Sequence, residues 1–177
     1  ILSRLHHTIQ LVTAAMDEFQ FTYATREIAQ LMEELSNWYI RRSRARFWAH
    51  GLTADKRGAF STLYEVLTNI CRLLAPFTPF ITEDIYRQLT GKSVHIEDYP
   101  IYEEKLVNPQ LEQEMSTVLT VVELGRSIRN SQGMKVKQPL SDLIVEVSGE
   151  LTGYQAYSQL IQEELNIKAC IWTHDFS

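Results

Sequence analysis

The sequence predicts a mainly α protein, in which an antiparallel helical bundle over residues 1–140 is followed by a small α+β appendage over residues 141–177. Apolar residues recur at the three- and four-residue spacing of helices as far as about Gly133, and short β-branched runs follow them. The hydrophobic fraction of 45% and the charged fraction of 22% are those of a water-soluble globular protein. The length suits one domain, or one domain with an appendage.

Two helices are expected in the first 50 residues. The first is already in progress at Leu2, without an initiator Met or a capping residue, and we therefore expect the chain to be a fragment of a longer protein. The second begins at Phe21 and runs to about Ala49, because an apolar stripe continues through it until Gly51 offers a stop.

Three further helices complete the expected bundle. The third runs from about Asp55 to Leu74, where the prolines of "APFTPF" cannot donate helical hydrogen bonds and interrupt the pattern. A fourth helix follows, and "GKSVHIEDYPIYEEKLVNP" lacks periodicity and is interpreted as a connecting loop. Asn108 and Pro109 then provide a cap and a first turn for the fifth helix, which ends at Gly133.

The last part of the chain combines strands with one helix. "SDLIVEVSG" and "NIKACIWTH" are rich in β-branched residues and predict strands. "YQAYSQLIQEEL", between them, predicts a helix. Together these segments form the expected α+β appendage.

A run of arginines is the most unusual feature of the second helix. "NWYIRRSRARFW" places Arg41, Arg42, Arg44 and Arg46 within six positions, in a chain whose formal net charge is -5. No Asp or Glu occurs from residue 35 to residue 54, so a partner is expected to supply the negative charge. A basic helix end is also commonly solvated and favourable to the helix dipole, which is the structural alternative.

The helical spacing divides this run between two faces. Residues three and four apart share a face, which groups Asn37, Arg41, Arg44 and Trp48. Guanidinium groups suit phosphate and stack on bases, so we expect this face to bind nucleic acid. Trp38 and Arg42 fall in line with the apolar stripe instead. Trp38 is therefore expected in the core, and for Arg42 pairing with an acid of a neighbouring helix is the alternative role.

A second window without acids, "LGRSIRNSQGMKVKQPLS", lies near the end of the fifth helix. It contains Arg126, Arg129, Lys135 and Lys137, so the two windows hold eight of the 17 basic residues. If the fifth helix packs antiparallel beside the second, both windows form one positive surface on an acidic body. Such segregation of charge is typical of a protein that binds a polyanion.

Several classes of site are not supported by the sequence. The five histidines show no metal-ligand spacing, and Cys71 and Cys170 are too far apart for a zinc motif, so neither a metal nor a disulfide framework is expected. No glycine-rich phosphate loop and no catalytic constellation is found, and the role of His95, a loop histidine, stays open. The two unpaired cysteines favour a reducing, cytoplasmic location, and no apolar run reaches the roughly 18 residues of a membrane span.

Four blocks of the sequence carry a resemblance to a known family. In order they are "LSNWYIRRSRARFW", "LAPFTPFITEDIYRQL", "SVHIEDYP" and "ELGRSIRNSQGMKVKQPLSDL". They closely resemble the region that follows the catalytic core in the isoleucyl-tRNA synthetase family. The first two are shared in looser form by the valine and leucine enzymes and indicate a class I anticodon-binding helical bundle, whereas "KVKQPL" resembles the isoleucine enzymes more specifically.

The resemblance implies a role in tRNA binding within a larger enzyme. Isoleucine tRNA and the catalytic core of the same polypeptide are the implied partners, and a monomer is expected. The matched positions implied to face RNA are Asn37, Arg41, Arg44, Trp48, Arg126, Arg129, Lys135, Lys137 and Gln138. The two ATP-site signatures of the family are absent from this sequence. The resemblance therefore implies that the catalytic core uses the ATP and that this chain needs no cofactor. It also implies that the chain alone does not catalyse.

Two alternatives to this interpretation are retained. The bundle could be a protein docking module whose arginines meet acidic helices, although such an interface needs an exposed apolar centre. The other alternative is the equivalent domain of a valyl- or leucyl-tRNA synthetase.

Overall fold

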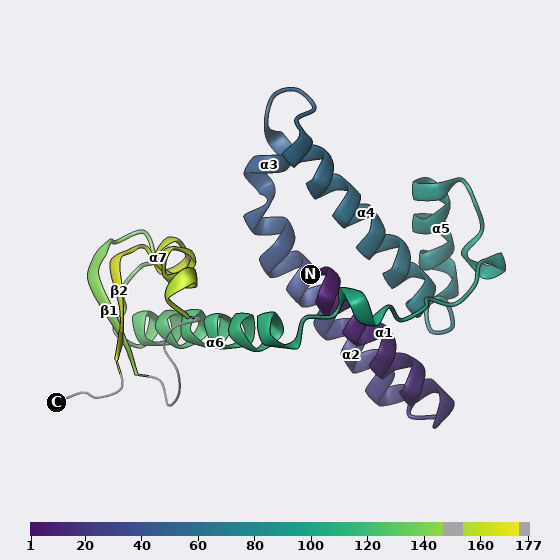
Figure 1. The fold of residues 1–177 in the computed structure, drawn as a ribbon, viewed down its shortest axis with the longest axis horizontal. Coiled ribbons are helices and arrows are strands. Elements are labelled where there is room, and N and C mark those ends of the chain that lie inside the picture. The colour runs from purple at the N-terminus through teal and green to yellow at the C-terminus, as the bar shows by residue number, and fades with distance from the viewer. Residues whose placement is uncertain (147–153, 174–177) are drawn as a thin grey trace. The chain divides into compact units, whose positions relative to one another are not determined.

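The computed structural model describes residues 1–146 and 154–173 of the chain (Figure 1). It divides into two compact units, Ile1–Asn108 and Pro109–Ser177. The boundary expected from the sequence, between residues 140 and 141, therefore lies inside the second unit. The fifth helix packs against the segments that follow it in the chain and therefore belongs to the second unit.

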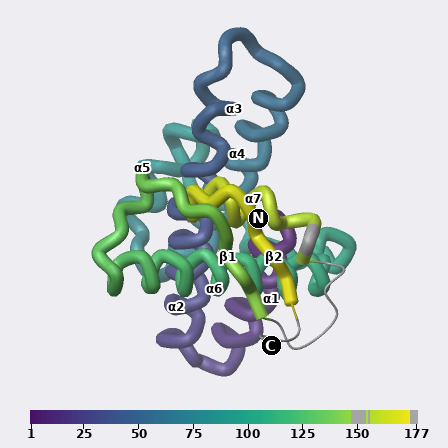
Figure 2. The backbone as a smooth tube through the Cα atoms, turned by 90° about the vertical axis from the view of Figure 1, so that its left-hand side faces the viewer, coloured from purple at the N-terminus to yellow at the C-terminus, as the bar shows by residue number. Residues whose placement is uncertain are grey.

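All regular secondary structure in the first unit is helical. Its elements are α1 (Leu2–Asp17), α2 (Phe21–Glu34), the π-helical turn η1 (Leu35–Ile40), α3 (Arg44–Trp48), α4 (Ala54–Leu74), α5 (Pro79–Thr90) and the 3-10 turns η2 (Val94–Ile96) and η3 (Glu104–Leu106). α1 and α2 lie side by side in both views (Figures 1 and 2). Thr53 caps α4 by accepting a hydrogen bond from the backbone N–H of Lys56 at 3.1 Å.

The main core of this unit joins three helices. Its buried side chains include Leu5, Ile9 and Val12 of α1, Ile28 and Leu31 of α2, and Val66, Ile70 and Leu73 of α4. Leu63, Leu67 and Leu74 of α4 are partly buried and pack against this core. Cys71 of α4 packs instead with Tyr86 of α5 and Val94 of η2.

The second helix differs from the prediction in its continuity. It starts at Phe21 as expected, but α-helical geometry ends at Glu34, a π turn spans Leu35–Ile40, and α3 is a separate helix of five residues. A π turn accommodates one more residue than an α turn, so the side chains after it no longer follow the face that simple helical spacing assigns. This change bears directly on the arginine run.

The second unit contains α6 (Pro109–Ser131), β1 (Leu140–Glu146), η4 (Tyr154–Tyr157), α7 (Ser158–Leu165) and β2 (Ile167–Thr173). β1 and β2 pair in parallel, with Leu140 opposite Ile167 and Val145 opposite Trp172. The two predicted strands are confirmed within the described residues, and their predicted residues 147–149 and 174 lie outside them. The predicted helix between them is α-helical from Ser158, after the 3-10 turn η4. Gly125 allows α6 to approach α7 closely, because a Cβ atom there would lie 2.5 Å from Cδ1 of Leu165.

Candidate RNA-binding surface

The π turn is held to the body of the first unit on one side. Leu35 is buried in the main core, and Tyr39 and Ile40 pack against that core. The Tyr39 hydroxyl donates to the carbonyl oxygen of Ala59 in α4 at 3.2 Å. With this side anchored, the arginine run that follows presents its other side to solvent.

The four residues grouped by the sequence are all exposed: Asn37, Arg41, Arg44 and Trp48. The indole of Trp48 is 82% exposed, an unusual state for the largest apolar side chain. Arg41 is ordered locally, because its Nε donates to the carbonyl oxygen of Asn37 at 2.8 Å. Planar, cationic and aromatic groups thus occupy one exposed segment of the first unit.

Trp38 occupies a position between the core and the surface. It is half-buried, so the expectation that it lies in the core is wrong. The guanidinium carbon atoms of Arg41 and Arg42 lie 5.9 Å and 5.6 Å from its ring centroid, within the range of cation–π attraction. Arg42 is half-buried as well, so the indole gives both arginines a common support.

Arg46 has a different role from the other arginines of the run. Its guanidinium holds the carboxylate of Asp55 in the first turn of α4, with Nε 3.0 Å from Oδ1 and 2.9 Å from Oδ2. The hydrogen bond from Arg46 lowers the pKa of Asp55, and the same bond raises the pKa of Arg46. The rings of Phe47 and Phe60 also meet, at 5.0 Å between centroids. These contacts join α3 to α4, which Figure 1 shows connected by a loop.

The second basic window lies in the second unit. Arg126, Lys135, Lys137 and Gln138 are exposed there. Arg126 pairs with Glu164 of α7, whose carboxylate side chain is only 2% exposed, so part of its charge is already compensated. Because the two windows belong to different compact units, their union into one surface stays a prediction.

Arg129 is buried, with 3% of its surface exposed. Its Nη1 donates to the carbonyl oxygens of Lys135 and Gln138 at 3.1 and 3.0 Å. Its Nη2 donates to those of Leu165 and Asn166 at 2.7 and 3.3 Å. These bonds join the end of α6 to the loop before β1 and to the end of α7, so the structure gives this side chain a structural role in place of the expected RNA contact.

Within residues 1–146 and 154–173, no group of three or more His, Cys, Asp or Glu side chains could hold a metal ion. In the same part of the chain, no helix is both long enough and apolar enough to cross a membrane.

Comparison with known proteins places the chain in a family. Residues 1–145 match the model of the anticodon-binding domain of tRNA ligases. The chain belongs to this family. It is 54% identical over 170 residues to isoleucine–tRNA ligase 2 of a Bacillus cereus strain, an alignment that covers 96% of this chain and 16% of that relative. It is 43% identical over 184 residues to the isoleucine–tRNA ligase of Clostridium tetani, covering 100% of this chain and 18% of that relative.

The resemblance to the anticodon-binding region of isoleucyl-tRNA synthetases is confirmed by these relatives. The chain spans less than a fifth of the length of each relative. The segment around Arg41 and Trp48 has exposed cationic and aromatic side chains. The sequence showed no sign that Asp55 would neutralise Arg46 or that Arg129 would be buried, because both depend on residues brought together by folding.

Proposed function

We propose that this chain binds the anticodon stem and loop of isoleucine tRNA and thereby supports ATP-dependent isoleucylation by the longer, cytoplasmic ligase to which it belongs. The proposed RNA contacts in the first unit are Asn37, Arg41, Arg44 and Trp48. Those in the second unit are Arg126, Lys135, Lys137 and Gln138.

The observation that carries the proposal is the exposure of Arg41, Arg44 and Trp48 on one short segment. An unpaired RNA loop presents base faces and phosphates together. Guanidinium groups bind phosphate with two donors, and an exposed indole offers a stacking plane worth about 1–3 kcal/mol per base. Arg46 is left out of the contact set because it is half-buried, unlike Arg41 and Arg44, and because its guanidinium holds Asp55.

In the second unit, Arg129 acts as a positioning residue for the loop that carries Lys135 and Lys137. It binds the carbonyl oxygens of Lys135 and Gln138 while the two lysine side chains are exposed. The lysines are proposed to neutralise phosphate, which requires charge rather than a fixed planar geometry.

Catalysis is assigned to the rest of the ligase and not to this chain. We expect the chain, mixed with ATP, isoleucine and tRNA, to form no isoleucyl-adenylate and no charged tRNA. Pyrophosphate exchange that depends on isoleucine, in a preparation free of host synthetase, would contradict this assignment.

The decisive experiment replaces Arg41 and Arg44 together by Ala and measures binding of isoleucine tRNA over a range of salt concentrations. Each lost phosphate contact should reduce the slope of log affinity against log salt by about 0.7–0.9. The thermal unfolding midpoint should stay within the range of ordinary surface substitutions, which cost about 0.5 kcal/mol or less.

The matched control replaces Arg57 and Arg87, two exposed arginines of α4 and α5 in the same unit, and so removes the same charge. Its salt slope should stay close to that of the parent chain. If the Arg41 and Arg44 variant binds like the parent at every salt concentration, the segment does not bind RNA, and a protein docking role would replace it.

A further inference from the structure

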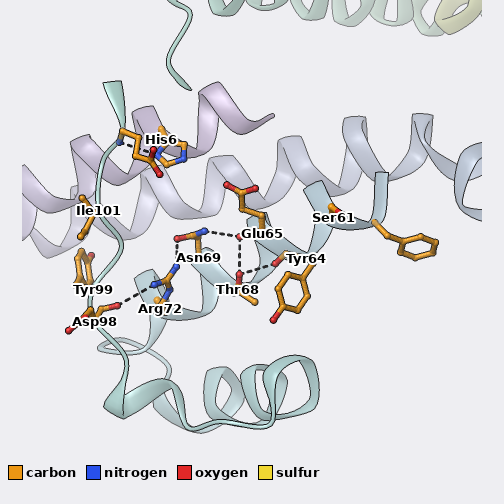
Figure 3. A pocket seen from close by; sticks show the side chains of 12 residues that line it. His6, Ser61, Tyr64, Glu65, Thr68, Asn69, Arg72, Asp98, Tyr99 and Ile101 are labelled. Carbon is orange, nitrogen blue, oxygen red and sulfur yellow. Dashed lines mark hydrogen bonds between the residues drawn. The ribbon is translucent and has the colours of Figure 1, made fainter. Parts of the chain in front are cut away.

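A cavity of about 800 Å³ lies in the first unit, where α1 and α4 meet the loop that follows η2 (Figure 3). Its arginine is bonded to the protein around it, because Arg72 donates to Oδ1 of Asn69 at 2.7 Å and to the carbonyl oxygen of Asp98 at 3.5 Å. Nε2 of His6 and the hydroxyl of Tyr99 have no hydrogen-bond partner among the described residues, but both atoms are buried. A molecule in the cavity would not reach these two groups, and no ligand is assigned to it.

A turn in the second unit is held by hydrogen bonds of a different kind. It comprises residues 135–138 and is closed by the backbone N–H of Gln138, which donates to the carbonyl oxygen of Lys135 at 2.9 Å. The side chains of all four residues of the turn are exposed. Lys135, Lys137 and Gln138 are proposed RNA contacts, so the conformation of this turn decides where their side chains start.

Each of the four backbone carbonyl oxygens of the turn accepts a hydrogen bond from one of two side chains. Nη1 of Arg129 donates to those of the first and last residues at 3.1 and 3.0 Å. Nδ2 of Asn166 donates to those of the two central residues, Val136 at 3.0 Å and Lys137 at 3.1 Å. The backbone of the turn is thereby fixed while its side chains remain exposed.

Asn166 joins the end of α7 to this turn. It ends α7 in the left-handed conformation, with φ at 51°, which Gly adopts most readily and Asn also adopts. Its carbonyl oxygen accepts from the backbone N–H of Leu140 at 3.1 Å and from Nη2 of Arg129 at 3.3 Å. Gly would supply the same conformation and the same backbone bonds, so anchoring of the turn is the separate contribution of the Asn side chain.

We propose that Asn166 is a positioning residue for RNA binding, which holds the 135–138 turn in the conformation from which its lysines meet phosphate. This role rests on the proposed function, in which Lys135 and Lys137 contact tRNA. A backbone that is ordered before binding avoids the entropy cost of ordering it on binding. Asn166 thereby raises the affinity through the turn, because its side-chain amide is directed at the carbonyl oxygens and not at the RNA.

The test replaces Asn166 by Gly, which keeps the left-handed conformation and removes both side-chain hydrogen bonds. In the whole chain labelled with nitrogen-15, the order parameters of the amides of residues 135–138 should fall from about 0.85 to below about 0.6. The affinity for isoleucine tRNA should fall about tenfold, the cost of ordering roughly one residue of backbone again on binding. The slope of log affinity against log salt should stay unchanged, because the number of phosphate contacts is the same.

A second substitution should restore what Asn166→Gly removes. The backbone N–H of Val136 donates to no group of the described residues, and its φ is not positive. Pro is favoured at this second position of a turn. Val136→Pro in the Asn166→Gly chain should therefore return the order parameters and the affinity toward those of the parent. A loss of affinity caused by general destabilisation of the unit would not be rescued in this way.

Asn130→Ala is the matched control, because it removes an exposed amide from the end of α6, shortly before the turn. Its affinity for isoleucine tRNA should equal that of the parent. If Asn166→Gly does not fold, Asn166→Asp takes its place, since it keeps the shape of the side chain and replaces the donating amide by an acceptor. The order parameters of the turn should then fall in the same way, and unchanged values would overturn the proposal.

The variant in which Lys135 and Lys137 are both replaced by Met separates the two possible failures. It should reduce the salt slope by about 1.4–1.8, the value of two phosphate contacts. If its slope is that of the parent, the proposed contacts of the second unit are wrong, and the role of Asn166 is overturned with them. If its slope falls but Asn166→Gly binds tRNA like the parent, the lysine contacts stand and only the positioning role is overturned.

Discussion

Replacing Arg129 by Met removes a buried guanidinium from the second unit while keeping an unbranched side chain of similar length. Four backbone carbonyl oxygens lose their donor at once. At a net value of roughly 1 kcal/mol for each hydrogen bond, the second unit should lose about 4 kcal/mol of stability.

The indole N–H of Trp172 reports on this unit. It is bonded to the Ser158 hydroxyl at 2.9 Å, and the side chain is 9% exposed. Hydrogen exchange at this site in the Arg129→Met variant should be about a thousandfold faster, the equivalent of about 4 kcal/mol. Amides of α1 and α2, in the other unit, should keep their protection.

Lys137→Met is the matched control for this experiment. It removes a cation from the same loop, but the lysine is exposed, so stability should change by about 0.5 kcal/mol or less. The structural role assigned to Arg129 is refuted if its replacement costs less than about 1 kcal/mol, the value of a single ordinary hydrogen bond.

Three further predictions concern packing and charge. Leu73→Ala should lower the free energy of unfolding of the first unit by about 2–5 kcal/mol in urea titrations, since the side chain is fully buried, and a loss below 1 kcal/mol would argue against that core. Gly125→Ala should cost about 1–3 kcal/mol in the second unit, because the new Cβ meets buried Leu165, and an unchanged midpoint would mean that the Leu165 side chain moves aside without cost. Asp55 should titrate in carboxyl NMR with a pKa below the ordinary value of about 3.9. The stability contributed by its pair with Arg46 is therefore present above about pH 3.9 and is lost as the pH falls through the lowered pKa. Arg46→Ala should return the pKa of Asp55 to about its ordinary value.

The sequence by itself determined the helices, the strands and the exposed basic segment. Periodic apolar residues, Gly and Pro determine the backbone conformation only of the residues near them in the sequence. The helix starts at Phe21 and Pro109 and the helix end at Gly91 were therefore predictable. The exposure of Arg41 and Arg44 agrees with the sequence prediction, although the prediction assumed a continuous α-helix and the structure has a π turn before them. The family resemblance was visible because each of its motifs is a contiguous stretch of the sequence.

Only the tertiary structure decided which basic side chains are available to a partner. Arg126 and Arg129 stand three positions apart in the same window, yet only the second is enclosed, because the carbonyl oxygens of Leu165 and Asn166 reach it from 36 and 37 positions along the chain. His6 likewise accepts a hydrogen bond from the backbone N–H of Glu103, 97 positions away. Local spacing cannot specify such partners, since burial and charge pairing result from the sum of many weak contacts between distant segments, and these exist only once the chain has folded.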